Sequence, residues 1–126
     1  MIPKKAILVA SVIVCAAALC VFVLTFLVER IPAPDMTRSR IGGFEYRLHD
    51  YYAVNHRLPA SLSDIPVEAN KDNEVVDGWG RPIQYSSNGT TVTLLSLGKD
   101  GRRGGTGEDA DIVDTFDVVK EPEFNF

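Results

Sequence analysis

The chain has 126 residues, a formal net charge of −4 and only two cysteines. This length is enough for about one domain. Beyond Arg30 the chain holds sixteen acidic and ten basic residues. Such a balance excludes a nucleic-acid-binding protein, which needs a basic stripe, and a domain that lies flat on an anionic membrane surface.

An apolar segment over residues 6–28 follows a short N-terminus, residues 1–5, that carries two lysines. The segment contains no charged residue, and in a helix it spans about 34 Å, slightly more than the ~30 Å core of a bilayer. We therefore predict a transmembrane helix over 6–28. A cleaved signal peptide fits less well, because the segment exceeds the usual apolar length of about 7–15 residues and no A-x-A site follows.

The charges that flank this segment bear on its orientation. Lys4 and Lys5 precede it and favour a cytoplasmic N-terminus. Arg30, Arg38 and Arg40 follow it and weaken the bias. We expect a single-pass protein with its N-terminus in the cytoplasm. Both cysteines, Cys15 and Cys20, lie within the apolar segment, so the rest of the chain has no disulfide framework.

The segment after the span predicts a linker and an amphipathic helix. Residues 29–35 contain Pro32 and Pro34, which restrict the backbone, and we expect a linker there. Residues 36–55 show helical periodicity, with Asp35 or Thr37 as the expected cap. The apolar stripe is Ile41, Phe44, Leu48, Tyr51 and Tyr52, and the residues expected on the other faces are Arg38, Arg40, Glu45, Arg47 and Asp50.

The second half of the chain shows turn and strand signals. A short turn is expected over residues 61–65, and "DGWGRP" predicts a tight corner. Strands over 83–86 and 91–97, joined by Asn88-Gly89, predict a β-hairpin. The expected fold is therefore α+β, an amphipathic helix packed on a small antiparallel sheet, with residues 36–126 as the domain outside the membrane.

Residues capable of catalysis are few. The two histidines, His49 and His56, have no cysteine or carboxylate motif beside them. The chain contains no G-x-S-x-G motif, P-loop, dinucleotide fingerprint or zinc-ligand spacing. We expect no enzymatic activity and no small-molecule substrate.

A loop rich in glycine and acid, "LGKDGRRGGTGEDADI", covers residues 97–112 and includes Asp100, Glu108, Asp109 and Asp111. If these oxygen donors bind a metal, calcium is favoured over zinc or copper, because no thiol or imidazole lies nearby. The spacing is not that of an EF-hand. From the residues alone, a solvated acidic loop is an equally good interpretation.

Three motifs together resemble a known family. These are the helix exit with Tyr51, Asn55 and Pro59, the corner "DGWGRPIQY" and the closing "LLSLGKDGRRGGTGEDADI". Over residues 40–112 they are similar to the C-terminal domain of the major, G-type pseudopilin of type II secretion. The resemblance implies a calcium ion held by the carboxylates of Asp100, Asp109 and Asp111 and by the Leu97 carbonyl. Glu108 falls at a position that varies in the family.

The resemblance also implies a role and a location. It predicts a structural subunit or accessory of a secretion machine in the bacterial inner membrane, with the C-terminal domain in the periplasm or outside. The expected partners are other pseudopilins, secretion-machinery proteins or further copies of this chain, and no nucleic acid.

The N-terminal segment departs from the family pattern. Prepilins have a glycine before the apolar run and a glutamate fifth within it, whereas the first glycine here is Gly42 and the first acid is Glu29. We therefore expect the mature chain to keep Met1 or Ile2 as its first residue. The alternative function is a stand-alone, membrane-anchored calcium-binding interaction domain that is not assembled into a pseudopilus.

Overall fold

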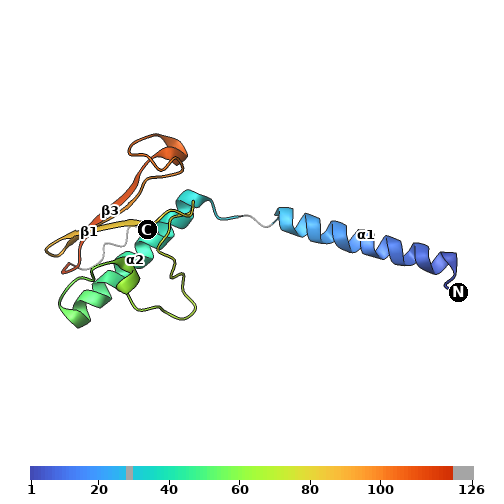
Figure 1. Cartoon of the computed structure of the whole chain (residues 1–126), viewed down its shortest axis with the longest axis horizontal. Coiled ribbons are helices and arrows are strands. Elements are labelled where there is room, and N and C mark those ends of the chain that lie inside the picture. Colours follow the sequence, from blue (N-terminus) through green and yellow to red (C-terminus); the bar gives the residue numbers. More distant parts are fainter. Residues whose placement is uncertain (28–29, 121–126) are drawn as a thin grey trace. The chain divides into compact units, whose positions relative to one another are not determined.

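The computed structural model describes residues 1–27 and 30–120. The chain forms two compact units, Met1–Ile31 and Pro32–Phe126. The first contains helix α1, Lys4–Leu27. The second contains helix α2, two short 3₁₀ turns named η1 and η2, and strands β1 to β3 (Figure 1).

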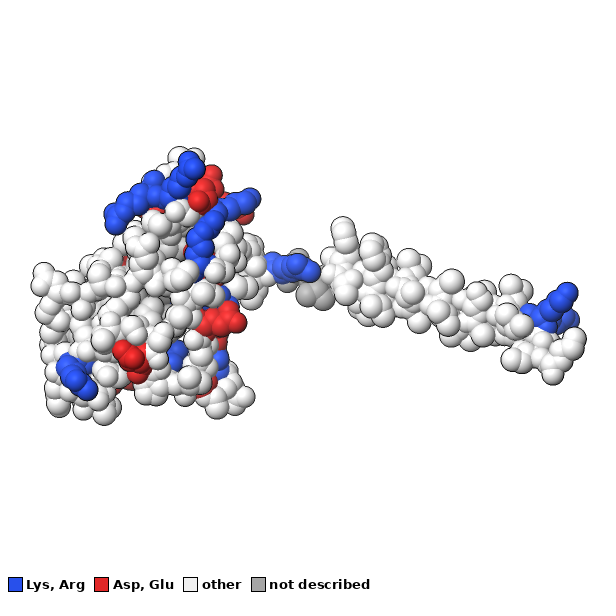
Figure 2. Space-filling model, in the orientation of Figure 1, with Lys and Arg blue, Asp and Glu red and all other residues white. Residues whose placement is uncertain are grey.

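Helix α1 is long and apolar enough to cross a membrane, and it alone among the described residues is so. Its surface is uncharged beyond Lys4 and Lys5 at its start (Figure 2). The hydroxyl of Thr25 donates to the Phe22 carbonyl at 2.8 Å, so this polar group is satisfied within the helix itself. That is the arrangement required of a polar side chain surrounded by lipid.

Helix α2, Ala33–Asn55, begins three residues before the predicted Met36. The predicted linker, 29–35, is therefore too long. Pro34 is tolerated in the first turn because the N–H that proline lacks has no intrahelical partner there. The predicted side-chain cap is also wrong, since Pro32 holds the N-cap position without a side-chain hydrogen bond. The helix ends at Asn55 and is capped by His56, which has a left-handed φ of 53° and whose N–H bonds to the Tyr52 carbonyl.

The predicted apolar stripe of α2 is buried. Ile41, Phe44 and Leu48 are 3%, 2% and 0% exposed, and Tyr52 packs beside them. Arg47, expected on a solvent face, is only 6% exposed, so that expectation is wrong. The reason is tertiary, because the segment after η1 covers this part of the helix and accepts the Arg47 guanidinium at the Pro66 carbonyl.

The predicted turn over 61–65 is confirmed as η1, Leu62–Asp64. Ser61 and Asp64 form a capping box at its start, with the Ser61 N–H donating to Asp64 Oδ2 at 3.1 Å. The turn directs Leu62 and Ile65, both 6% exposed, into the core.

The sheet has three antiparallel strands in the order β1-β2-β3: Gln84–Asn88, Thr91–Ser96 and Ile112–Asp117. The hairpin of β1 and β2 confirms the prediction, with the turn one residue later than expected. Asn88 pairs with Thr91, so Gly89 and Thr90 form the loop, and Gly89 has a φ of 64°. Glycine with positive φ at the first loop position is typical of a type II′ turn.

The core lies between α2 and one face of the sheet (Figure 1). Val92 and Leu94 of β2 are fully buried, and Phe116 of β3 packs against the same cluster. The expected α+β class, a helix packed on a small antiparallel sheet, is therefore confirmed. Strand β3 is an addition to that expectation.

Candidate functional site

The glycine-rich acidic loop connects β2 to β3. Because Ser96 pairs with Ile112 in the antiparallel register, the first and last residues of the loop lie next to each other. Within the loop, η2 spans Gly107–Asp109. Five glycines have φ between 60° and 91°, a region that side-chain-bearing residues rarely adopt: Gly98, Gly101, Gly104, Gly105 and Gly107. These glycines therefore allow the successive tight turns of the loop.

Hydrogen bonds and close backbone packing hold the two limbs of the loop together. The Lys99 N–H donates to the Glu108 carbonyl at 2.9 Å. The Gly104 N–H donates to Asp111 Oδ2 at 3.1 Å. A Cβ at Gly98 or Gly105 would lie 2.7 to 2.8 Å from backbone oxygens of residues 109–110. The segment that the sequence left open between a solvated turn and an ordered loop thus has a defined, folded course.

The predicted ligands lie in different surroundings. Leu97, Asp109 and Asp111 are half-buried, whereas Asp100 is exposed and its Oδ1 accepts the Arg102 N–H at 3.0 Å. Over residues 1–27 and 30–120, no three His, Cys, Asp or Glu side chains are close enough together to hold a metal ion. The loop brings its two limbs together without gathering the carboxylates of Asp100, Asp109 and Asp111 around one point.

One oxygen in this loop fits a cation. Asp111 Oδ1 is buried and has no hydrogen-bond partner among the described residues. A buried carboxylate oxygen left unpaired costs free energy. A hard cation satisfies such an oxygen, and carboxylate and backbone carbonyl oxygens are the donors that calcium prefers. The donor chemistry of the predicted set is therefore suited to calcium.

Basic side chains also lie over this loop. The Nζ atom of Lys99 lies 2.9 Å from Glu108 Oε2, with both side chains more than half exposed. The hydrogen bond that Lys99 donates to Glu108 raises the pKa of Lys99. Figure 2 shows basic and acidic side chains next to each other at this end of the domain. Glu108, left out of the predicted ligand set, is thus engaged with a lysine.

The buried carboxylate of Asp77 links the corner formed by residues 77–82, "DGWGRP", to the start of the acidic loop. This corner is called the tryptophan corner below. Asp77 is 1% exposed, and its Oδ1 accepts the N–H groups of Trp79 and Arg81 at 3.0 and 2.9 Å. Its Oδ2 accepts the hydroxyl of Ser96, at the end of β2, at 2.7 Å. Sequence reasoning placed Asp77 in the corner but missed this link, because nothing local pairs residue 77 with residue 96.

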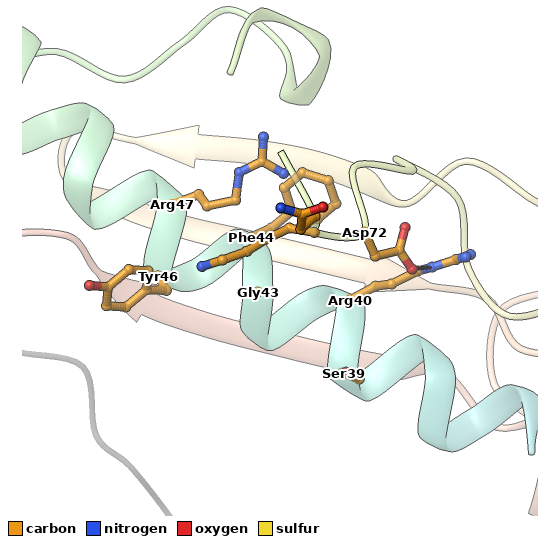
Figure 3. Close-up of a pocket in the computed structure, with 9 residues that line it drawn as sticks. Ser39, Arg40, Gly43, Phe44, Tyr46, Arg47 and Asp72 are labelled. Carbon is orange, nitrogen blue, oxygen red and sulfur yellow. Dashed lines mark hydrogen bonds and ion pairs between the residues drawn. The ribbon is translucent and has the colours of Figure 1, made fainter. Parts of the chain in front are cut away.

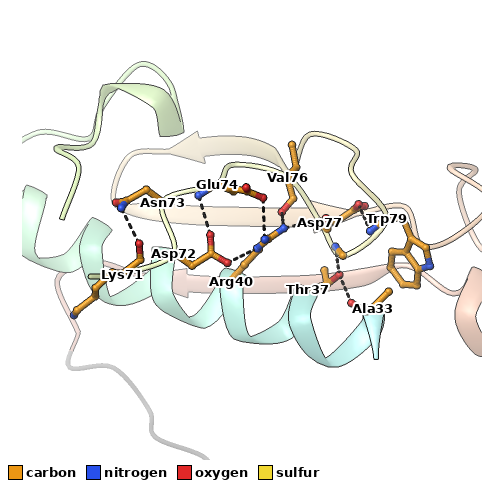
Figure 4. Close-up of polar contacts among 11 residues, drawn as sticks. Ala33, Thr37, Arg40, Lys71, Asp72, Asn73, Glu74, Val76, Asp77 and Trp79 are labelled. Carbon is orange, nitrogen blue, oxygen red and sulfur yellow. Dashed lines mark hydrogen bonds and ion pairs between the residues drawn. The ribbon is translucent and has the colours of Figure 1, made fainter. Parts of the chain in front are cut away.

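The same corner packs on the start of α2 (Figure 4). Thr37 is fully buried, donates to the Ala33 carbonyl at 2.7 Å and accepts the Gly78 N–H at 2.8 Å. A Cβ at Gly78 would overlap the Ala33 carbonyl, so only glycine fits this approach. Thr37, a predicted helix cap, therefore joins the helix to the corner.

Arg40 is a second tie between α2 and the following segment. Its guanidinium pairs with Asp72 at 2.6 Å and Glu74 at 2.9 Å, and it donates to the carbonyls of Val76 and Asp77 (Figure 4). The Arg40 hydrogen bond lowers the pKa of Asp72. The Arg40 side chain is only 12% exposed, contrary to the solvent-facing position expected for it.

A depression of about 420 Å³ lies beside Arg40 and Arg47 (Figure 3). Its basic side chains already have acidic partners. Arg40 pairs with Asp72, and both Lys71 and Arg47 lie within 3.4 Å of Glu68. With its charges neutralised in this way, the depression is a poor site for an anion.

The two histidines serve the packing of α2. The Nδ1 atom of His49 lies 3.1 Å from the Val118 carbonyl, and its ring stacks on Phe116 with centroids 5.6 Å apart. His56 is the left-handed residue that ends the helix. His49 lies within the helix and His56 follows its last residue, and the two have separate structural contacts.

Comparisons with known proteins agree with the fold and the loop. The family model for protein G of the type II secretion system (T2SS) matches residues 33–115. The chain is 30% identical over 90 residues to type II secretion system core protein G of Xanthomonas campestris pv. campestris, an alignment that covers 62% of this chain and 63% of that protein. It is 47% identical over 53 residues to the protein of the same name from Pseudomonas aeruginosa, which covers 37% of each.

The chain thus spans less than two thirds of the length of either relative. No solved structure matches it. The family match runs from the first residue of α2 into β3 and includes the corner and the whole loop. The chain therefore belongs to the protein G family of the type II secretion system.

Proposed function

We propose that this chain is a membrane-anchored, pseudopilin-like structural subunit or accessory of a type II secretion machine, with a domain stabilised by calcium. The family match over residues 33–115 is the observation that carries this proposal. Helix α1 supports the anchoring, because its length and composition suit a single pass through the bacterial inner membrane. The partners are other pseudopilins, secretion-machinery proteins or further copies of this chain.

The proposed calcium ligands are the Leu97 carbonyl and the carboxylates of Asp100, Asp109 and Asp111. The unpaired, buried Oδ1 of Asp111 supports this assignment, as do the turns that bring the two limbs of the loop together. When bound, calcium supplies positive charge that offsets the repulsion among the carboxylates. Because the described carboxylates are not gathered around one point, binding couples to a rearrangement of the loop that brings them together.

The calcium part is tested by thermal unfolding of the detergent-solubilised full chain, followed by the fluorescence of Trp79, the single tryptophan. A ligand that binds only the folded state adds about 2.7 kcal/mol at a hundredfold excess over its Kd. That is a large share of the ~5–15 kcal/mol typical of a domain. The midpoint should rise by several degrees in millimolar calcium relative to chelator.

Matched variants locate the effect. Asp109→Ala and Asp111→Ala should abolish the calcium-dependent rise. Glu108→Ala should retain it, because Glu108 lies in the same turn but is outside the proposed set. Identical midpoints for the unaltered chain with and without calcium would contradict a calcium-stabilised domain and leave an acidic loop held by its own hydrogen bonds.

One observation favours the alternative, a stand-alone, membrane-anchored calcium-binding interaction domain. Helix α1 ends at Leu27, and α2 starts anew at Ala33 after Pro32, so the described helices are two separate elements. Cross-linking in intact membranes separates the two functions. A subunit of an assembly should yield a ladder of multiples of this chain or adducts with other pseudopilins. A stand-alone domain should yield neither.

A further inference from the structure

The Arg81 side chain extends from the tryptophan corner to the acidic loop. Its Nη1 donates to two consecutive carbonyls, those of Gly98 at 2.9 Å and Lys99 at 2.8 Å. Its backbone N–H is held by the buried Asp77, and its own carbonyl accepts the Asp77 N–H. The backbone N–H and the backbone carbonyl of Arg81 are therefore both hydrogen-bonded, which fixes the position from which the side chain extends to the loop.

The loop in turn is shaped around this side chain. Gly101 has a φ of 68°, and a Cβ there would lie 2.7 Å from Arg81 Nε and 3.0 Å from Cζ. Any larger residue at 101 would push the guanidinium away. Residues 98–101 therefore contact Arg81 through two carbonyls and through the bare face of a glycine.

These contacts distinguish the carbonyls at the start of the loop, because Arg81 occupies some of them and leaves another for calcium. Those of Gly98 and Lys99 accept hydrogen bonds from a cationic donor, and such charge-assisted bonds are stronger than neutral ones. The carbonyl of Leu97, the residue immediately before, is the one assigned to calcium. The guanidinium thus engages the neighbouring oxygens that would otherwise compete with it.

We propose that Arg81 is the positioning residue of the calcium loop, an internal cation that holds residues 98–101 in their folded course without a metal. Ion binding then has fewer residues to order, which improves affinity. This inference rests in part on the proposed calcium site. The ordering of residues 98–101 by Arg81 in the absence of metal does not depend on that site.

The charge of Arg81 and its hydrogen bonds should have opposite effects on the affinity of the loop for calcium. A guanidinium near bound calcium repels it, so a purely electrostatic role predicts tighter calcium binding when the charge is removed. A positioning role predicts weaker binding. The sign of the change therefore decides between the two.

The metal-free test is limited trypsin digestion of the detergent-solubilised full chain in chelator, with the cleavage products identified by mass. Trypsin sites within the loop follow Lys99, Arg102 and Arg103. Removing Arg81 takes away no site, because Pro82 follows it and blocks cleavage there. Arg81→Met should raise the rate of loop cleavage about three- to tenfold, the range expected for losing two partly exposed charge-assisted hydrogen bonds.

Two controls make this result specific. Cleavage after Arg57, an exposed residue outside the loop, should keep its rate in Arg81→Met, which excludes general unfolding. Arg38→Met removes the same charge from a side chain that is 63% exposed, and it should leave loop cleavage unchanged. Equal loop cleavage in Arg81→Met and the unaltered chain would overturn the proposal.

Calcium titration of the same proteins provides the second readout. Arg81→Met should raise the Kd for calcium about three- to tenfold, and Arg81→Lys, which keeps the charge but not the guanidinium, should also raise it. A Kd that falls or stays the same in Arg81→Met would overturn the positioning role. If the unaltered chain shows no response to calcium, the proposed calcium site fails, and the digestion in chelator still decides whether Arg81 orders the loop.

Discussion

The hydroxyl of Ser96 donates a 2.7 Å hydrogen bond to Oδ2 of Asp77, and both residues are 1% exposed. This contact joins the end of β2 to the tryptophan corner, 19 residues earlier in the chain. The same carboxylate accepts two backbone N–H groups, so three donors depend on it. The Asp77 carboxylate therefore fixes the position of the end of β2, where the acidic loop begins.

Asp77→Ala should lower the free energy of unfolding by about 3–5 kcal/mol, because it leaves three donors without their acceptor. Asp77→Asn keeps the shape and one acceptor oxygen, so it should cost only about 1 kcal/mol. Urea denaturation of the full chain in detergent measures both. Equal losses in the two variants would contradict this expectation, because they would show that the shape and the acceptor oxygen that asparagine keeps contribute nothing.

Gly78→Ala and Gly42→Ala should have opposite effects on stability. A Cβ at Gly78 would overlap the Ala33 carbonyl, so alanine there should destabilise the domain by about 1–3 kcal/mol. A Cβ at Gly42, in the middle of α2, meets nothing within 4 Å, so alanine there should stabilise it by about 0.5–1 kcal/mol. Denaturation midpoints of the two variants provide the comparison. A stabilised Gly78→Ala protein would contradict the close contact between the corner and the helix.

Stability should depend on pH through Glu45 on α2 and Asp114 on β3. Burial, and then the Asp114 carboxylate, raise the pKa of Glu45 above its usual 4.5. As the pH falls through the raised pKa toward 4.5, the folded chain takes up a proton before the unfolded chain does, so the free energy of unfolding rises. Glu45→Gln should remove this rise and stabilise the domain at pH 7 by about 0.2–1 kcal/mol. Asp50→Asn, on the exposed side of the same helix, should keep the rise.

Below the usual carboxyl pKa of 3.8 the trend should reverse. The pKa of Asp72 is lowered by the Arg40 hydrogen bond, and that of Asp117 by the Val119 N–H. Protonating these groups at lower pH removes the stability that their charged forms contribute. For the unaltered chain, the free energy of unfolding measured by denaturation between pH 7 and 3 should therefore pass through a maximum. A continuous loss of stability on acidification would contradict the raised pKa of Glu45.

The orientation of the anchor is tested by proteolysis. Lys4 and Lys5 precede the apolar segment, and basic residues favour the cytoplasmic side. Protease added to intact spheroplasts should therefore remove residues 36–126 and leave a small membrane-bound fragment. Full protection of the domain until the membrane is disrupted would reverse the assigned orientation.

Local patterns were sufficient for much of this protein. A charge-free run long enough to cross a bilayer, the 3.6-residue period of Ile41, Phe44 and Leu48, and the turn signal near Gly89 each depend on neighbours in the chain. The apolar helix, the amphipathic helix and the hairpin were therefore predictable. The combination of the tryptophan corner with the closing acidic loop also identified the family correctly. The calcium ligands remain a prediction.

Tertiary structure decided the rest. Strand β3 was not predicted, because its half-buried face, Ile112, Asp114 and Phe116, includes a charged residue while the apolar Val113 is exposed, which obscures the alternation typical of a strand. The burial of Arg47, the link between Asp77 and Ser96 and the reach of Arg81 to Gly98 and Lys99 join residues 17 to 19 positions apart. Hydrogen bonds over such separations leave no local pattern, since they exist only once the helix, corner and sheet have packed together.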